Sequence, residues 1–265
     1  MDLAEARERT PDQGAVDVRH PWEAARLDVV ARLIAGRAPL GAGSIVLDVG
    51  CGDTFVSEQL AARYPRSRFY AIDTAFSDDL LARYRARLAG SPVEPFASLD
   101  DVPPLDRPVS LVLLMDVIEH IDDARGFLRA LASRPYINRE TRFLITVPAF
   151  QSLFCSHDTF LGHYRRYSSR LLREHAESSG LRVDDIGYFF FSLLPLRLLQ
   201  VVRERLAGTG ERAPTTGLVT WGESAAAAAA MRRVLVFDAR VAFGLKRIGI
   251  TLAGLSNYAV CRKSV

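Results

Sequence analysis

The amino-acid sequence predicts an α/β protein with helices on both faces of a doubly wound, mostly parallel sheet. Apolar runs at 45–49, 69–72 and 109–115 have the length of buried strands. Segments with helical spacing of apolar residues separate these runs, and glycine or polar turns end them. The length of 265 residues suits one such domain with extensions.

The most informative stretch is residues 45–73, which reads as strand, turn, helix and strand. The first strand ends at Gly50-Cys51-Gly52, and residues 54–64 have helical spacing. The two glycines lack β-carbons where a ligand would approach the backbone, next to the N–H groups of a helix. Asp73 closes the second strand about 20 residues later, where a carboxylate can accept both hydroxyls of a ribose. The pattern predicts a nucleoside-cofactor site.

Two residues indicate which cofactor fits. A dinucleotide site has a third glycine at the position of Phe55, and an aromatic side chain there would crowd a pyrophosphate. Asp48, just before the turn, would repel phosphate but could hold an ammonium group. S-adenosylmethionine (SAM) carries an amino-acid tail and no phosphate, so the residues favour SAM over NAD.

The segment Leu47-Asp48-Val49-Gly50-Cys51-Gly52 resembles motif I of the class I SAM-dependent methyltransferases. That family usually has a further glycine at the position of Thr54. The segment 116–120, Asp-Val-Ile-Glu-His, resembles the end of strand four in the small-molecule branch. Glu119 and His120 have the residue types of catalytic groups, but a hydrogen-bonded pair that fixes the loop is the favoured interpretation. Met115 and Asp116 would face the methionine end of the cofactor, because ligands lie beyond the carboxyl ends of parallel strands. The resemblance implies a Rossmann-like seven-stranded sheet and a SAM site made of Asp48, Gly50, Cys51, Gly52, Asp73, Met115 and Asp116.

Residues 148–167 follow the fifth predicted strand and lack clean periodicity, yet they concentrate histidines, arginines and aromatic residues. Loops that a rigid sheet places beside a cofactor normally hold the substrate. The segment is similar to the His-Asp…Gly-His-Tyr-Arg-Arg-Tyr segment of a bacterial methyltransferase group found beside glycan or secondary-metabolite genes. We therefore expect His157 or His163 to act as the base, since unperturbed imidazoles titrate near neutral pH. The expected substrate-binding residues are Tyr164, Arg165, Arg166 and Tyr167.

The chain divides into four expected segments. Residues 1–19 are expected to be a flexible N-terminus, and 20–191 to be the SAM-binding core. Residues 192–255 form a helical insert, expected to act as a cap, between strands six and seven, and residues 256–265 hold the last strand. The insert is more apolar than one contact face requires. Its surface could be covered by internal packing, which the residues favour, by a second subunit of a homodimer, or by a membrane surface.

The composition indicates which other partners, and which cellular compartment, to expect. The formal charge of +3 is too small to indicate nucleic acid, and the three cysteines show no metal-binding spacing, so we expect no metal. Scattered cysteines and a polar N-terminus without a signal peptide indicate the cytoplasm.

The function expected from the sequence is transfer of a methyl group from SAM to a small-molecule, glycan or secondary-metabolite acceptor in biosynthesis. The replacement of glycine by Thr54 leaves open a protein of the same fold that binds SAM without turnover. A third interpretation is an NAD-linked oxidoreductase. The absence of the third glycine, beside which a pyrophosphate would bind, argues against it.

Overall fold

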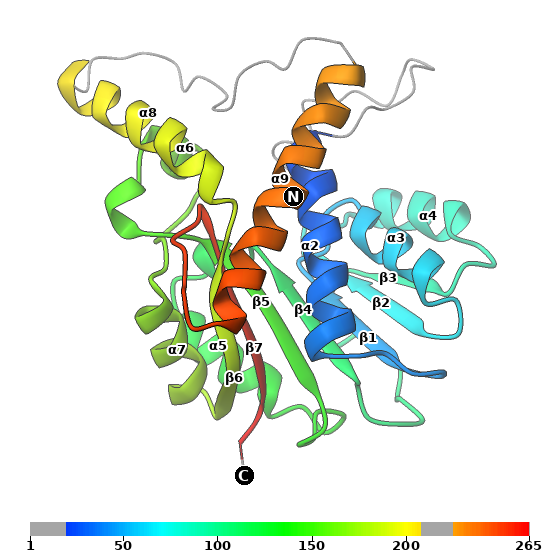
Figure 1. The fold of residues 1–265 in the computed structure, drawn as a ribbon. Coiled ribbons are helices and arrows are strands. Elements are labelled where there is room, and N and C mark those ends of the chain that lie inside the picture. Colours follow the sequence, from blue (N-terminus) through cyan, green and yellow to red (C-terminus); the bar gives the residue numbers. More distant parts are fainter. Residues whose placement is uncertain (1–19, 208–224, 265) are drawn as a thin grey trace.

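The computed structural model describes residues 20–207 and 225–264, so the N-terminal segment 1–19 lies outside the described residues. A seven-stranded sheet of order β3-β2-β1-β4-β5-β7-β6 forms the centre (Figure 1). The strands are β1 (Ile45–Val49), β2 (Arg68–Ile72), β3 (Val93–Phe96), β4 (Leu111–Met115), β5 (Arg142–Pro148), β6 (Leu181–Phe189) and β7 (Ser256–Lys263). Strands β1 to β5 pair in parallel, and β7 inserts antiparallel between β5 and β6. The predicted doubly wound, mostly parallel seven-stranded sheet is confirmed.

Alternation within the strands builds a core on each face of the sheet. In β4, Leu111, Leu113 and Met115 contribute to one hydrophobic cluster, and Val112 and Leu114 to the other. All five are buried, as expected for a central parallel strand covered on both sides.

Helices cover both clusters. On the first face lie α2 (Pro21–Arg37), α3 (Phe55–Arg63), α4 (Asp78–Arg87) and α9 (Ala225–Arg247). On the second lie α5 (Ala124–Ala132) and α7 (Ser169–Ser178). The remaining helical elements are η1 (Ile118–His120), η2 (Gln151–Leu153), α6 (Ser156–Phe160), η3 (Phe191–Leu193) and α8 (Leu194–Ala207). Parallel pairing requires such crossover connections, and they place the loops after β1, β2, β4 and β5 along one edge of the sheet.

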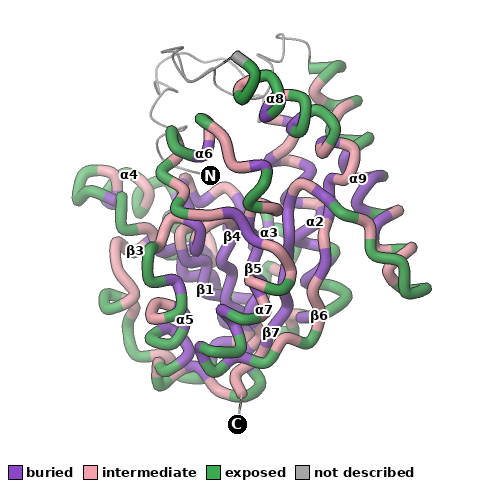
Figure 2. The backbone as a smooth tube through the Cα atoms, turned by 90° about the vertical axis from the view of Figure 1, so that its left-hand side faces the viewer, coloured by how far each residue is buried: buried purple, intermediate pink, exposed green. Residues whose placement is uncertain are grey.

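In the described part of the insert between β6 and β7, α8 and α9 have different surroundings. Helix α9 lies beside α2 in the layer over the sheet and buries Leu235, Ala239 and Ala242 there (Figure 1). Helix α8 lies beyond the edge of the sheet, near α6 (Figures 1 and 2). Residues 208–224 of the expected cap at 192–255 lie outside the described residues, and its described part is divided between a helix of the core layer and a projecting helix.

Internal packing does not cover all of the apolar surface of the insert. Exposed apolar side chains on its two helices are Leu196, Leu198, Leu199, Val202, Leu206, Val234 and Phe237. Among the described residues, no helix is long and apolar enough to cross a membrane.

Asp238 anchors the start of the insert. This buried carboxylate on α9 accepts hydrogen bonds from the backbone N–H groups of Phe191 and Ser192, at 3.0 and 2.7 Å. It also accepts one from the hydroxyl of Ser192, at 2.5 Å. These bonds satisfy N–H groups at the beginning of η3, which have no partner within that helix.

We expect Asp238→Ala to lower the free energy of unfolding by about 2–4 kcal/mol, because it removes charged hydrogen bonds and leaves buried N–H groups unsatisfied. Urea denaturation followed by circular dichroism measures this. Glu177→Ala is the control: it removes one exposed ion pair with Arg173 on α7, and a change of about 0.5 kcal/mol or less is expected. Equal effects of the two substitutions would contradict the anchoring role.

Candidate active site

The glycine turn after β1 brings two predicted cofactor residues into direct contact. Gly50 has φ of +73°, and a Cβ there would lie 2.6 Å from Cγ2 of Val117, so only glycine fits. Gly52 donates its backbone N–H to Oδ2 of Asp73, at 2.8 Å. Asp73 is half-buried at the end of β2, and its other oxygen accepts from the backbone of Ala75. The structure therefore places the turn and the acid of β2 side by side.

Thr54 adopts the backbone conformation that explains the glycine usual at this position. Its φ is +67°, in the left-handed region that costs a β-branched residue about 1–3 kcal/mol. Its buried hydroxyl donates to Glu58 and accepts from Arg87, each at 2.7 Å. These bonds hold the turn in the conformation that glycine would adopt freely.

Asp48 is fully buried in β1, and its Oδ2 accepts a hydrogen bond from the hydroxyl of Ser57 at 2.7 Å. Burial raises the pKa of Asp48 to about 6, against the opposing effect of that hydrogen bond. Its Oδ1 has no hydrogen-bond partner among the described residues, so one acceptor is open for a donor such as water or an ammonium group. Cys51, also buried, lies in the turn itself.

Asp116 follows β4 with φ of +55° and forms an ion pair with the buried guanidinium of Arg26 on α2. Its other oxygen accepts from the hydroxyl of Thr146 on β5, at 3.2 Å. Burial alone would raise the pKa of Asp116, but the charge of Arg26, its hydrogen bond and other nearby positive charge together lower that pKa. Arg26 also stacks on Trp22, 4.5 Å from the ring centroid. Helix α2 thus supplies a buried cation beside Met115, the buried last residue of β4.

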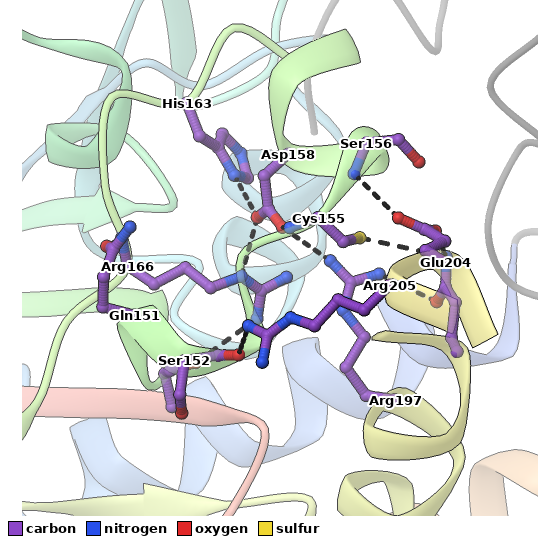
Figure 3. A network of polar contacts seen from close by, with 12 residues as sticks. Gln151, Ser152, Cys155, Ser156, Asp158, His163, Arg166, Arg197, Glu204 and Arg205 are labelled. Carbon is purple, nitrogen blue, oxygen red and sulfur yellow. Dashed lines mark hydrogen bonds and ion pairs between the residues drawn. The ribbon is translucent and has the colours of Figure 1, made fainter. Parts of the chain in front are cut away.

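A buried ionic network organises the segment after β5 (Figure 3). Asp158, on α6, is fully buried and pairs with Arg166 at 2.7 Å and with Arg197 of α8 at 2.7 Å. The same carboxylate contacts Nδ1 of His163 at 2.8 Å. Although burial opposes ionisation, these partners hold the pKa of Asp158 below its usual range.

The two histidines predicted as bases differ in their surroundings. Burial, reinforced by the charge of Arg197, lowers the pKa of His157 to about 4, and its Nδ1 has no partner among the described residues. The ring of His163 is oriented by Asp158 and lies 4.6 Å from that of His120, edge to face. Only His163 has the carboxylate-oriented imidazole typical of reactive histidines.

The four predicted substrate-binding residues lie in different environments. Tyr164 is 57% exposed, and Arg165 donates to the backbone carbonyls of residues 121 and 122. Arg166 is buried in the network with Asp158. Tyr167 is fully buried in the second hydrophobic cluster, and burial raises its pKa to about 12. Of the four, Tyr164 has the most surface available to a ligand, and Tyr167 packs as a core residue.

Glu119 does not form the expected hydrogen-bonded pair with His120. Its carboxylate is fully buried, and neither oxygen has a hydrogen-bond partner among the described residues. Burial, with the nearby charge of Asp116, raises the pKa of Glu119 well above its usual range. The backbone carbonyl of Glu119 accepts from the N–H of Tyr164 at 2.8 Å, and this bond joins η1 to the segment after α6.

Three residues important to this edge of the sheet were not found from the sequence: Arg26, Asp158 and Arg197. Arg26 and Arg197 each interrupt an apolar helical face, which is the signal that could have identified them. Asp158 gave no such signal, because only the fold reveals that it is buried.

We expect His157 to titrate near pH 4 in the folded protein, measured by NMR of the imidazole protons with His157→Gln to assign the resonance. Between pH 4 and the unfolded value near 6.5, the unfolded chain binds more protons at this group than the folded one. Its contribution to stability is therefore complete above pH 6.5 and is lost as the pH falls towards 4. Titration near 6.5 would show that the ring is hydrated rather than buried.

Comparison with known proteins agrees with this geometry. Residues 47–134 match the sequence model of a family described as a methyltransferase domain. The chain is 31% identical over 126 residues to the ubiquinone biosynthesis O-methyltransferase of Methylobacterium sp. (strain 4-46), covering 44% of this chain and 50% of the relative. It is 36% identical over 121 residues to the trans-aconitate 2-methyltransferase of Methylobacterium nodulans, covering 42% and 46%. The chain thus spans about half the length of the curated relatives it matches.

A solved structure extends the likeness of the fold. Coclaurine N-methyltransferase bound to N-methylheliamine and S-adenosylhomocysteine (SAH) aligns with a TM-score of 0.53 at 16% identity, covering 96% of this chain and 74% of that one. Residues 47–134 thus match a methyltransferase domain in sequence, and the seven-stranded sheet that contains them has the fold of that solved structure.

Proposed function

We propose that the protein binds SAM and transfers its methyl group to a small-molecule acceptor. The observation that carries the proposal is the hydrogen bond between the N–H of Gly52 and Asp73. It brings the glycine turn after β1 next to the acid that follows β2. A site for a nucleoside needs both, because the acid accepts hydrogen bonds from the free ribose hydroxyls beside the turn. The match of residues 47–134 to a methyltransferase domain supports the same assignment.

In this proposal, the oxygens of Asp73, each of which can accept a further hydrogen bond, would bind the ribose hydroxyls, while the amino-acid tail would lie near β4. The open Oδ1 of Asp48 would accept from the ammonium group, directly or through water. Arg26 is the buried cation that would pair with the carboxylate of the tail. It lies beside the end of β4, where it already binds the carboxylate of Asp116. The ammonium and carboxylate groups of the methionine tail would then each meet a charge of opposite sign.

Methyl transfer itself requires little from the protein beyond alignment, because the sulfonium of SAM is already activated. The chain must hold the acceptor in line with the methyl group and receive or help displace its proton. His163 is the histidine best suited to act on the acceptor, because Asp158 orients its ring. His157 is the weaker candidate, because burial holds its pKa near 4. Tyr164, exposed on the same segment, is the proposed contact with the acceptor.

The finer identity of the acceptor rests on the resemblance of the segment 157–167, which favours a glycan or secondary-metabolite biosynthetic compound. The core would be residues 20–191 with the last strand, while α8 would border the acceptor site through the pair of Arg197 with Asp158.

Calorimetric titration with SAM, SAH and NAD tests the proposal against its alternatives. SAM and SAH should bind, and NAD should not, because Phe55 occupies the position of the third dinucleotide glycine. Binding of NAD alone would favour the oxidoreductase. Binding of SAH without methyl transfer to any compound of an acceptor library would favour a non-catalytic SAM-binding protein.

Asp73→Ala should weaken SAH binding by about 1–3 kcal/mol, or roughly 5–150-fold, because it removes charged hydrogen bonds to the ribose. Asp79→Ala is the matched control, since Asp79 is exposed in the first turn of α4 and its loss should leave affinity unchanged. Unchanged affinity in Asp73→Ala would remove this residue from the site.

A further inference from the structure

Three metal-ligating side chains from two segments converge beside the end of β4. Glu119 and His120 belong to η1, and His163 follows α6. One potential ligand atom from each residue lies within 4.8 Å of the other two. Two ligands that bind one ion at about 2.1 Å are separated by about 3.4 Å at the tetrahedral angle. Small side-chain rotations would therefore bring the three atoms to one ion.

The backbone and the ionic network fix the relative positions of these ligands. The N–H of Tyr164 donates to the carbonyl of Glu119 at 2.8 Å, so the segment of His163 is tied to η1. Nδ1 of His163 contacts Asp158 at 2.8 Å, which leaves Nε2 for an ion (Figure 3). A carboxylate on the second ring nitrogen is the usual support of a metal-binding histidine, because it fixes the tautomer and the ring orientation.

The carboxylate of Glu119 supplies an independent observation. It is fully buried, and both of its oxygens lack a hydrogen-bond partner among the described residues. A buried carboxylate is stable as an anion only with a cation or several donors. The buried cation nearby, Arg26, already binds Asp116. A bound metal ion would supply the missing partner of Glu119.

We propose that Glu119, His120 and His163 bind a divalent first-row transition-metal ion. Two imidazoles and one carboxylate suit Zn²⁺, Co²⁺, Fe²⁺ or Mn²⁺, whereas Mg²⁺ and Ca²⁺ prefer oxygen ligands alone. The sequence did not predict this site, because His163 lies more than 40 residues after Glu119 and His120 and the ligands include no cysteine.

The site also indicates a class of acceptor, an inference that rests on the proposed methyl transfer. Three protein ligands leave at least one coordination position of the ion open. Since the cluster follows directly on Asp116, an acceptor bound there would be held by a hydroxyl or carboxylate oxygen on the ion. His163 would then be a ligand that positions the acceptor through the metal rather than a base.

Titration of the untagged full-length protein with Co²⁺, after treatment with a chelator, tests the metal site. We expect one Co²⁺ per chain, with visible absorption bands that report nitrogen and oxygen ligands, and displacement of Co²⁺ by Zn²⁺. Glu119→Gln and His163→Gln should each weaken Co²⁺ binding by at least about tenfold to a hundredfold. His157→Gln is the matched control, because this histidine lies on the same segment but outside the cluster, and binding should be retained.

A second readout guards against variants that fold poorly. Zn²⁺ should raise the Tm of the wild-type protein by binding the folded state, and should raise the Tm of Glu119→Gln by less at the same Zn²⁺ concentration. Equal Co²⁺ binding by the wild type and Glu119→Gln, or no binding by the wild type, would overturn the metal site. Calorimetry with SAH separates the two proposals: SAH binding without Co²⁺ binding removes only the metal, and the reverse result removes the proposed function.

Discussion

The ionisation of Asp158 inside the protein is the constraint on which the edge of the sheet depends. Two arginines and a histidine surround this fully buried carboxylate. Removing one partner of a buried ion pair typically costs about 3–5 kcal/mol, because the remaining charge is left without compensation. The segments that carry Asp158, His163 and Arg197 are therefore held in a single relative arrangement. That arrangement orients the imidazole of His163 and brings it to η1.

The same network explains how the insert can matter for a site built mainly by the sheet. Helix α8 contributes Arg197 to the carboxylate of Asp158, and the beginning of the insert is fixed to α9 through Asp238. The buried faces of both helices thus make contacts within the protein. Leucines, valines and a phenylalanine of these helices are exposed on their other sides.

This edge of the sheet shows how parallel strands bring polar residues together. Strands β1, β2 and β4 are followed by Gly50, Asp73 and Asp116, and the loops after them meet in space. Thr54 and Asp116, in the loops after β1 and β4, have positive φ. Each is held there by hydrogen bonds or an ion pair of its side chain. Backbone strain of this kind persists only where the surroundings fix it, and it is common at binding sites.

The sequence by itself determined the sheet and the glycine turn after its first strand. Apolar runs of strand length at 45–49 and 109–115 predict the strands, and glycines at 50 and 52 with an acid at 73 predict the turn. These are local patterns, formed by residues that are close together in the sequence. Only the tertiary structure decided which polar residues are buried and which of them meet. The pattern around Tyr167 resembled an exposed substrate loop, yet that ring is in the core, and Glu119 is buried without a hydrogen-bond partner among the described residues. Burial and the meeting of residues distant in sequence arise from packing between elements, which no local pattern contains.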